Sequence, residues 1–202
     1  MTNIKPILFC DFDGVLCHDR YWRSLPSEEY NKIQELLFQD DTALFNDWLR
    51  GKYSAEEVNK IVSEKINMPF EELWEIFVED CKTARVPKKA LEKLHNLRGQ
   101  YSVILITGNM DSFSRFTHPS LGLDKYFDHI SNSHYEGMHK TDNQGELFLK
   151  YADKYGVPIE DCILLDDSTK VYEVFTKLGG RAYLVTPEQD IFYHLENLTV
   201  GN

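Results

Sequence analysis

Short apolar runs recur along the chain, and most of them end at a polar or turn-forming residue. They span residues 7–10, 103–106, 129–130, 163–165 and 182–185. Continuous apolar runs of this length are typical of strands buried on both faces, as in a parallel sheet. Between the later runs, apolar residues return every three or four positions, as they do on one face of a helix. This alternation predicts an α/β fold around a parallel sheet.

One segment, from about residue 24 to residue 82, interrupts the alternation because it shows helical patterns and no convincing strand. Ser54 and Glu57 form a capping-box pattern, which marks the start of a helix whose apolar stripe reaches Ile66. Pro69 stands at the first turn of another predicted helix, where proline is tolerated. The pattern therefore predicts roughly sixty residues of helix inserted after the first strand.

Polar residues follow three of the predicted strands. The first is followed by Asp11 and Asp13, the second by Thr107-Gly108-Asn109, and the fourth by Asp166-Asp167-Ser168. Ligands of open parallel sheets bind at the carboxyl ends of the strands, so we expect these groups to lie together. Each group alone is equally well explained as a helix cap or a turn. Their convergence at one edge of the sheet favours a functional site.

The acidic residues of this predicted site come without a histidine or cysteine pattern typical of zinc. Neighbouring carboxylates repel one another unless a cation lies between them. Oxygen ligands of this kind favour a hard cation, magnesium above all. Magnesium held by a few carboxylates usually also engages substrate phosphate, which points to phosphoryl transfer.

Charge and composition narrow the partners. The formal net charge of −11 disfavours nucleic acid, and an anionic substrate needs local cations at its site. The apolar runs are too short to cross a bilayer, so no membrane partner is expected. Four cysteines without a C-x-x-C pair predict buried thiols in a reducing compartment, and hence a cytoplasmic protein. The oligomeric state stays open.

Four short motifs, in order, resemble those of the haloacid dehalogenase superfamily. They are Asp11-Phe12-Asp13-Gly14-Val15, which matches D-x-D-G-[VT]; Thr107; Lys140 in Gly137-Met138-His139-Lys140; and Asp166-Asp167-Ser168. Two departures stand out: Thr141 follows Lys140 where many relatives have proline, and the second motif reads Thr-Gly-Asn. The latter keeps the hydroxyl, and Gly108 lets a backbone N–H approach an anion closely.

The resemblance implies a Rossmann-like, three-layer core with a central parallel sheet and an inserted, all-helical cap of the C1 type. The core would comprise residues 1–17 and 84–202, and the cap residues 18–83. The helical segment predicted from the periodicity falls where that cap belongs.

The resemblance also implies roles for individual residues. Asp11 would be the nucleophile and Asp13 the general acid and base, while Thr107, Gly108 and Lys140 would bind the phosphoryl group. The metal ligands would be the carboxylate of Asp11, the backbone carbonyl of Asp13, and Asp166 and Asp167. True dehalogenases lack the second aspartate because a halide needs no proton. The expected activity is therefore magnesium-dependent hydrolysis of a small phosphorylated metabolite.

Several alternatives stay open at this point. A phosphomutase of the same fold would return the phosphoryl group to a sugar, and a binding or regulatory protein would use the scaffold without catalysis. A phosphonate hydrolase would need a cap lysine in the site, such as Lys52 or Lys60. Residues 20–23, which read Arg-Tyr-Trp-Arg, either contact a leaving group or form a solvated linker with packed aromatic rings.

Overall fold

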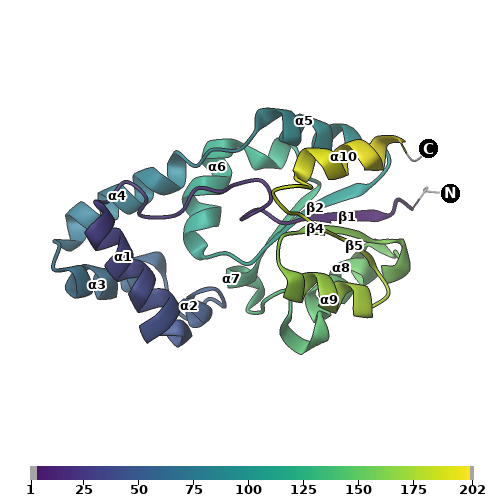
Figure 1. Ribbon diagram of the computed structural model, residues 1–202. Helices are drawn as coiled ribbons and strands as arrows, with labels where there is room; N and C mark the ends of the chain where they lie inside the picture. The colour runs from purple at the N-terminus through teal and green to yellow at the C-terminus, as the bar shows by residue number, and fades with distance from the viewer. Residues whose placement is uncertain (1–3, 201–202) are drawn as a thin grey trace.

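A computed structural model describes residues 4–200 and shows one five-stranded parallel sheet (Figure 1). The strands are β1 (Ile7–Cys10), β2 (Ser102–Thr107), β3 (His129–Asn132), β4 (Ile163–Asp166) and β5 (Arg181–Leu184), in the order β3-β2-β1-β4-β5. β1 is central, and Phe9 aligns with Ile104 of β2 and Leu164 of β4. The predicted α/β class with a parallel sheet is confirmed.

Helices cover both faces of the sheet, as the continuous apolar runs require. Successive side chains of a strand point to opposite faces, so the fully buried β1 needs apolar partners on each side. On one face α5 (Lys88–Leu97) and α10 (Ile191–Val200) pack on Leu8 and Cys10. On the other, α8 (Glu146–Tyr155) and α9 (Thr169–Lys177) pack on Ile7 and Phe9. Figure 1 shows these two layers above and below the strands, which is the Rossmann-like arrangement.

The segment between β1 and α5 contains no strand of the sheet. It forms α1 (Ser27–Glu35), a π-helical turn (Leu36–Asp40), α2 (Thr42–Trp48), α3 (Ala55–Ile66) and α4 (Phe70–Lys82), here called the insertion helices. They extend beyond the sheet at the left of Figure 1. The predicted capping box of Ser54 and Glu57 is present at the start of α3. Trp48, Val62 and Phe77 are fully buried in a second apolar core among these helices.

Short helical turns complete the described structure. They are a π-helical turn (Phe113–Thr117), α6 (His118–Leu121), α7 (Ser133–Glu136), and 3₁₀ turns at Leu123–Lys125, Asp142–Gln144 and Ile159–Asp161. All four cysteine side chains are free and buried. Among the described residues, no helix combines the length and apolar composition needed to cross a membrane.

Hydrogen bonds join the insertion helices to the loops that follow β2 and β3. The indole N–H of Trp48 donates to the Asp111 carboxylate at 2.9 Å, in a buried contact. Arg50 forms a bidentate pair with Asp142 at 2.7 and 2.8 Å. The Ser133 hydroxyl donates to the backbone oxygen of Leu49 at 2.7 Å. These bonds hold the insertion helices over the carboxyl edge of the sheet.

Candidate active site

Two buried aspartates lie side by side where β1 and β4 end. Cys10 aligns with Leu165, so the next residues, Asp11 and Asp166, come to the same edge, where they are 6% and 1% exposed. The ammonium of Lys140, from the loop after α7, donates to Asp11 at 2.5 Å and to Asp166 at 2.6 Å. Burial alone would lower the pKa of Lys140, but the charges of these two carboxylates outweigh it and raise the pKa above its usual value. Lys140 therefore stays protonated at neutral pH.

A third carboxylate completes a group suited to a cation. Oxygens of Asp11, Asp166 and Asp167 all lie within 4.8 Å of one another. Three carboxylates against one ammonium leave two excess negative charges, which a divalent cation would balance. Burial raises the pKa of Asp11 well above its usual range, although Lys140 opposes this shift. A second cation beside Asp11 would thus help to keep it ionised, and the all-oxygen donor set fits magnesium.

Gly14 makes room for this acidic group. Its φ of +76° lies in the left-handed region, and a Cβ at this position would stand 2.0 Å from an Asp167 oxygen. The turn that it forms is closed by a hydrogen bond from its N–H to the Cys17 oxygen at 2.8 Å. The glycine of D-x-D-G-V is therefore required by both backbone conformation and space.

Asp13 lies outside the three-carboxylate group and is held separately. Its carboxylate accepts a 2.6 Å hydrogen bond from the side-chain amide of Asn109, whose oxygen accepts one from the Tyr21 hydroxyl at 2.7 Å. Burial raises the pKa of Asp13 to about 6, although Arg20 and Lys140 lower it. A carboxyl group with a pKa near the working pH can both donate and accept a proton.

Thr107, the last residue of β2, and Gly108, which follows it, occupy different positions. Gly108 lines the cavity that also contains Asp11, Asp13 and Lys140. A Cβ on Gly108 would stand 2.3 Å from Nε2 of His139, so only glycine fits there without movement. Thr107 is fully buried, and its hydroxyl accepts from Asn109 at 3.3 Å. The structure thus brings all the predicted site residues to one edge, with the Thr107 side chain behind the cavity wall.

Two adjoining cavities share Asp13 in their walls. The first, of about 180 Å³, is lined by Asp11, Asp13, Asp167 and Lys140. The second, of about 280 Å³, opens towards the insertion helices and shares four lining residues with the first: Asp13, Arg20, Gly108 and His139. The catalytic edge therefore continues into a space between the core and the insertion helices.

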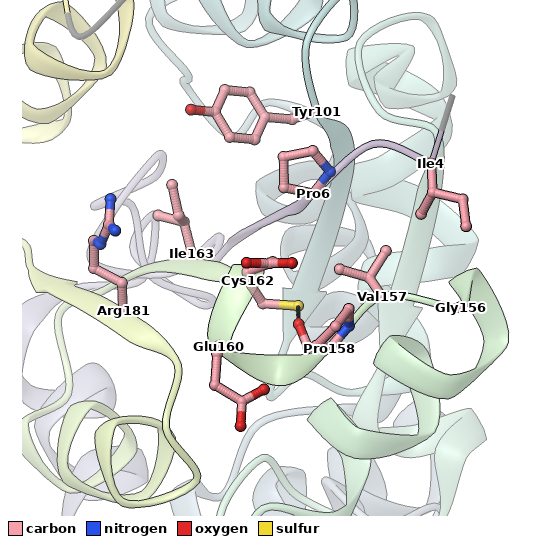
Figure 2. A pocket seen from close by; sticks show the side chains of 11 residues that line it. Ile4, Pro6, Tyr101, Gly156, Val157, Pro158, Glu160, Cys162, Ile163 and Arg181 are labelled. Carbon is pink, nitrogen blue, oxygen red and sulfur yellow. Dashed lines mark hydrogen bonds between the residues drawn. The ribbon is translucent and has the colours of Figure 1, made fainter. Parts of the chain in front are cut away.

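A separate cavity of about 460 Å³ lies at the opposite edge of the sheet. Figure 2 shows its lining, which includes Tyr101, Cys162 and Arg181 from the amino ends of β2, β4 and β5. The Cys162 thiol donates to the Pro158 backbone oxygen at 3.4 Å. Because ligands of parallel sheets bind at the carboxyl ends of the strands, the catalytic site is not at this edge.

The four residues 20–23 divide between the site and the insertion core. Arg20 and Tyr21 line the second cavity beside Asp13. Trp22 is buried, and its indole N–H donates to Asn59 at 2.9 Å. Arg23 donates to the backbone oxygen of Asp80 at 2.7 Å. Trp22 also lines the second cavity, so Arg20, Tyr21 and Trp22 are placed where a leaving group could reach them, and contact with one stays a prediction.

Sequence reasoning missed two residues at this site. Asn109 orients Asp13, and its place in Thr-Gly-Asn at a strand end was the available signal. His139 lines both cavities next to Lys140, and burial lowers its pKa to about 4, so its ring is neutral. No local pattern distinguished His139 from the other six histidines.

Solved structures resemble the chain over nearly its whole length. A HAD family enzyme from Bacteroides thetaiotaomicron, in complex with magnesium and inorganic phosphate, matches at a TM-score of 0.72 and 19% identity, covering 95% of this chain and 98% of its own. A predicted HAD-like family hydrolase from Porphyromonas gingivalis matches at 0.71 and 18%, covering 99% and 100%. A 2-haloacid dehalogenase from Pseudomonas syringae pv. Tomato matches at 0.68 and 15%, covering 97% and 98%.

At these identities the structural similarity establishes the fold alone. The similar structures include a 2-haloacid dehalogenase. No curated protein sequence matches the chain significantly. The family model of haloacid dehalogenase-like hydrolases matches residues 6–174, which includes every motif at the carboxyl edge of the sheet. The chain therefore belongs to the haloacid dehalogenase-like hydrolases.

Proposed function

We propose that the protein is a magnesium-dependent phosphatase that hydrolyses a small phosphomonoester in the cytoplasm. The observation that carries this proposal is the second aspartate. Asp13 is oriented by Asn109 and has a pKa of about 6, which suits proton transfer to a leaving oxygen. Release of a halide has no use for such a proton donor.

Each residue of the site would have its own role in the reaction. A carboxylate oxygen of Asp11 attacks phosphorus and the ester P–O bond breaks, which leaves an aspartyl-phosphate. Asp13 gives its proton to the departing alkoxide and then takes one from the water that hydrolyses the intermediate. Gly108 and Lys140, which line the first cavity, bind phosphoryl oxygens, where charge accumulates during transfer. Lys140 also fixes the orientation of Asp11.

Asp11, Asp166 and Asp167, with the backbone carbonyl of Asp13, would hold the magnesium ion. Bound there, it supplies positive charge against the repulsion between carboxylate and phosphate. The 4.8 Å spread of the three carboxylates and the space left by Gly14 support this assignment.

The insertion, residues 18–83, would act as a cap over the site. Its hydrogen bonds to Asp111, Ser133 and Asp142 support this role, since all three partners follow strands that end at the site. Neither Lys52 nor Lys60 lines the two cavities, so the cap supplies no lysine of the kind a phosphonate hydrolase needs.

The decisive experiment measures two products in parallel. The purified protein is incubated with a panel of phosphomonoesters, with and without magnesium, and with a 2-haloacid. We expect release of inorganic phosphate that depends on magnesium and falls at least about 10³-fold in Asp11→Asn. Halide release without phosphate release would overturn the proposal. Conversion of a hexose 1-phosphate to its 6-phosphate would instead identify a mutase.

A further inference from the structure

The second cavity has a partly aromatic wall. Aromatic and aliphatic side chains make up half of its lining: Tyr21, Trp22, Leu37, Phe38, Phe45 and Leu49 from the insertion helices and their connections, and Met110 from the loop after β2. We call this space of about 280 Å³ the aromatic chamber. Phe38 is 50% exposed, and its ring packs against that of Phe45 with centroids 4.6 Å apart. An exposed aromatic ring, packed against a partly buried one beside a catalytic cavity, suggests a ligand contact.

The chamber opens at the place where a leaving group must go. Asp13 lines both cavities, and it is the residue expected to protonate the leaving oxygen. Whatever is bonded to that oxygen must extend away from the phosphorus on the Asp13 side. Arg20, Gly108 and His139 also line both cavities, so the two cavities adjoin along a shared wall.

Four of the polar side chains that line the chamber are already engaged: Asp19 accepts from Arg85, and Asp13, Asn109 and Tyr21 are joined by hydrogen bonds. Arg20, Gln34 and His139 remain, and none of their side chains forms a hydrogen bond or ion pair among residues 4–200. A sugar would bring several hydroxyls into apolar surroundings, and each unpaired hydroxyl is costly to bury. A flat apolar group would instead gain contact with the rings.

We propose, on the basis of the phosphatase function above, that the aromatic chamber receives the leaving group and that the substrate is a phosphomonoester of an alcohol bearing a planar aromatic group. The ring lies between the insertion helices and the loop after β2, and the phosphate lies against Asp11. An aromatic ring would contact the apolar wall of the chamber, and its alcohol oxygen would lie beside Asp13.

The test compares esters whose leaving oxygens are alike. 2-Phenylethyl phosphate, ethyl phosphate and glucose 6-phosphate are all primary alkyl esters, so differences in kcat/KM report binding of the alcohol part. We expect 2-phenylethyl phosphate to exceed each of the others by about tenfold or more. An equal or higher kcat/KM for glucose 6-phosphate would overturn the aromatic assignment and leave the phosphatase proposal intact. No phosphate release from any ester would overturn both.

Two variants test whether the aromatic chamber causes the preference for 2-phenylethyl phosphate. Phe38→Ala removes a half-exposed ring of the chamber and should lower the ratio of kcat/KM for 2-phenylethyl over ethyl phosphate about tenfold. Phe70→Ala is the matched control because Phe70 stacks on Trp74, with centroids 5.9 Å apart, outside the chamber. The control should keep the ratio of the parent protein. An unchanged ratio in Phe38→Ala, or an equal fall in both variants, would contradict the proposal.

Discussion

The two cavities that meet at Asp13 are built in opposite ways. One is formed by strand ends and glycine turns and contains three aspartates with one lysine. The other is formed mainly by side chains of helices and their connections, and most of them are apolar. Strand ends are held by the register of the sheet, so they can keep carboxylates within 4.8 Å of one another. The side chains on helix surfaces are not aligned by strand pairing. They provide apolar surface that a ligand can contact.

We expect the first cavity to determine the type of reaction and the second to determine the choice of substrate. In the proposed reaction, charged groups at the sheet edge would act on phosphorus, whatever alcohol is attached to it. The apolar residues of the aromatic chamber would contact only the alcohol. A substitution at the sheet edge should therefore lower activity on every ester, whereas one in the chamber should change the order of the esters. The predictions below test this division.

After Asp11, the largest effect is expected at Asp13. Asp13→Asn keeps the size of the side chain and removes the proton that the leaving oxygen needs. We expect kcat/KM for ethyl phosphate to fall by about 10²-fold or more. p-Nitrophenyl phosphate should lose much less, because its leaving group needs little protonation. Steady-state assays of both esters check this, and an equal loss on the two would show that Asp13 does not protonate the leaving group.

A smaller effect is expected for metal affinity. Asp167 is exposed, whereas Asp166 already accepts hydrogen bonds from Lys140 and from the Ser168 N–H. Asp167→Asn should therefore raise the magnesium concentration for half-maximal activity by about 10-fold or more. Asp161→Asn, at the far cavity of Figure 2, is the control and should leave that concentration unchanged. An unchanged magnesium requirement in Asp167→Asn would remove this residue from the metal site.

The pH dependence should carry the signature of Asp13. With a pKa of about 6, its carboxyl group is protonated below pH 6 and loses the proton above it. The ratio of kcat/KM for ethyl phosphate in the parent protein to that in Asp13→Asn should be flat below pH 6. Above pH 6 it should fall by about tenfold per unit. Phosphomonoesters themselves titrate near pH 6, and the ratio cancels that contribution. A ratio independent of pH would contradict the assignment.

The same division explains what could be predicted from the sequence. Asp11, Asp13, Asp166 and Asp167 directly follow or end apolar strands, so local pattern and sheet geometry suffice to bring them together. Lys140 lies in a loop, and only the resemblance to a known family pointed to it. Its approach to Asp11, 129 positions away, depends on how the loop packs.

The aromatic chamber could not be predicted because its geometry depends on a local irregularity. A π-helical turn at Leu36–Asp40 buries Leu37 and leaves Phe38 half exposed beside the cavity. The apolar periodicity around Leu36 and Leu37 indicated only a helix. Asn109 was visible at a strand end, but its bond to Asp13 joins residues 96 positions apart. Such contacts arise from tertiary packing.

The smallest effect is expected where the two regions are joined. Trp48→Phe keeps most of the ring and removes the N–H that donates to the buried Asp111 carboxylate. Asp111 keeps its bonds from the Ala55 N–H and from Arg115, so we expect a loss of about 1–2 kcal/mol in the free energy of unfolding. Denaturant titration measures it, with Trp74→Phe as the control. Trp74 is a partly buried tryptophan whose indole N–H donates no hydrogen bond among residues 4–200.

The bond from Trp48 to Asp111 should also affect substrate choice. Because Asp111 follows β2 two positions after Asn109, loss of this bond should shift the insertion helices relative to Asp13. The ratio of kcat/KM for 2-phenylethyl over ethyl phosphate should then fall a few-fold in Trp48→Phe alone. Equal behaviour of the two variants would mean that the bond to Asp111 does not position the aromatic chamber over the catalytic edge.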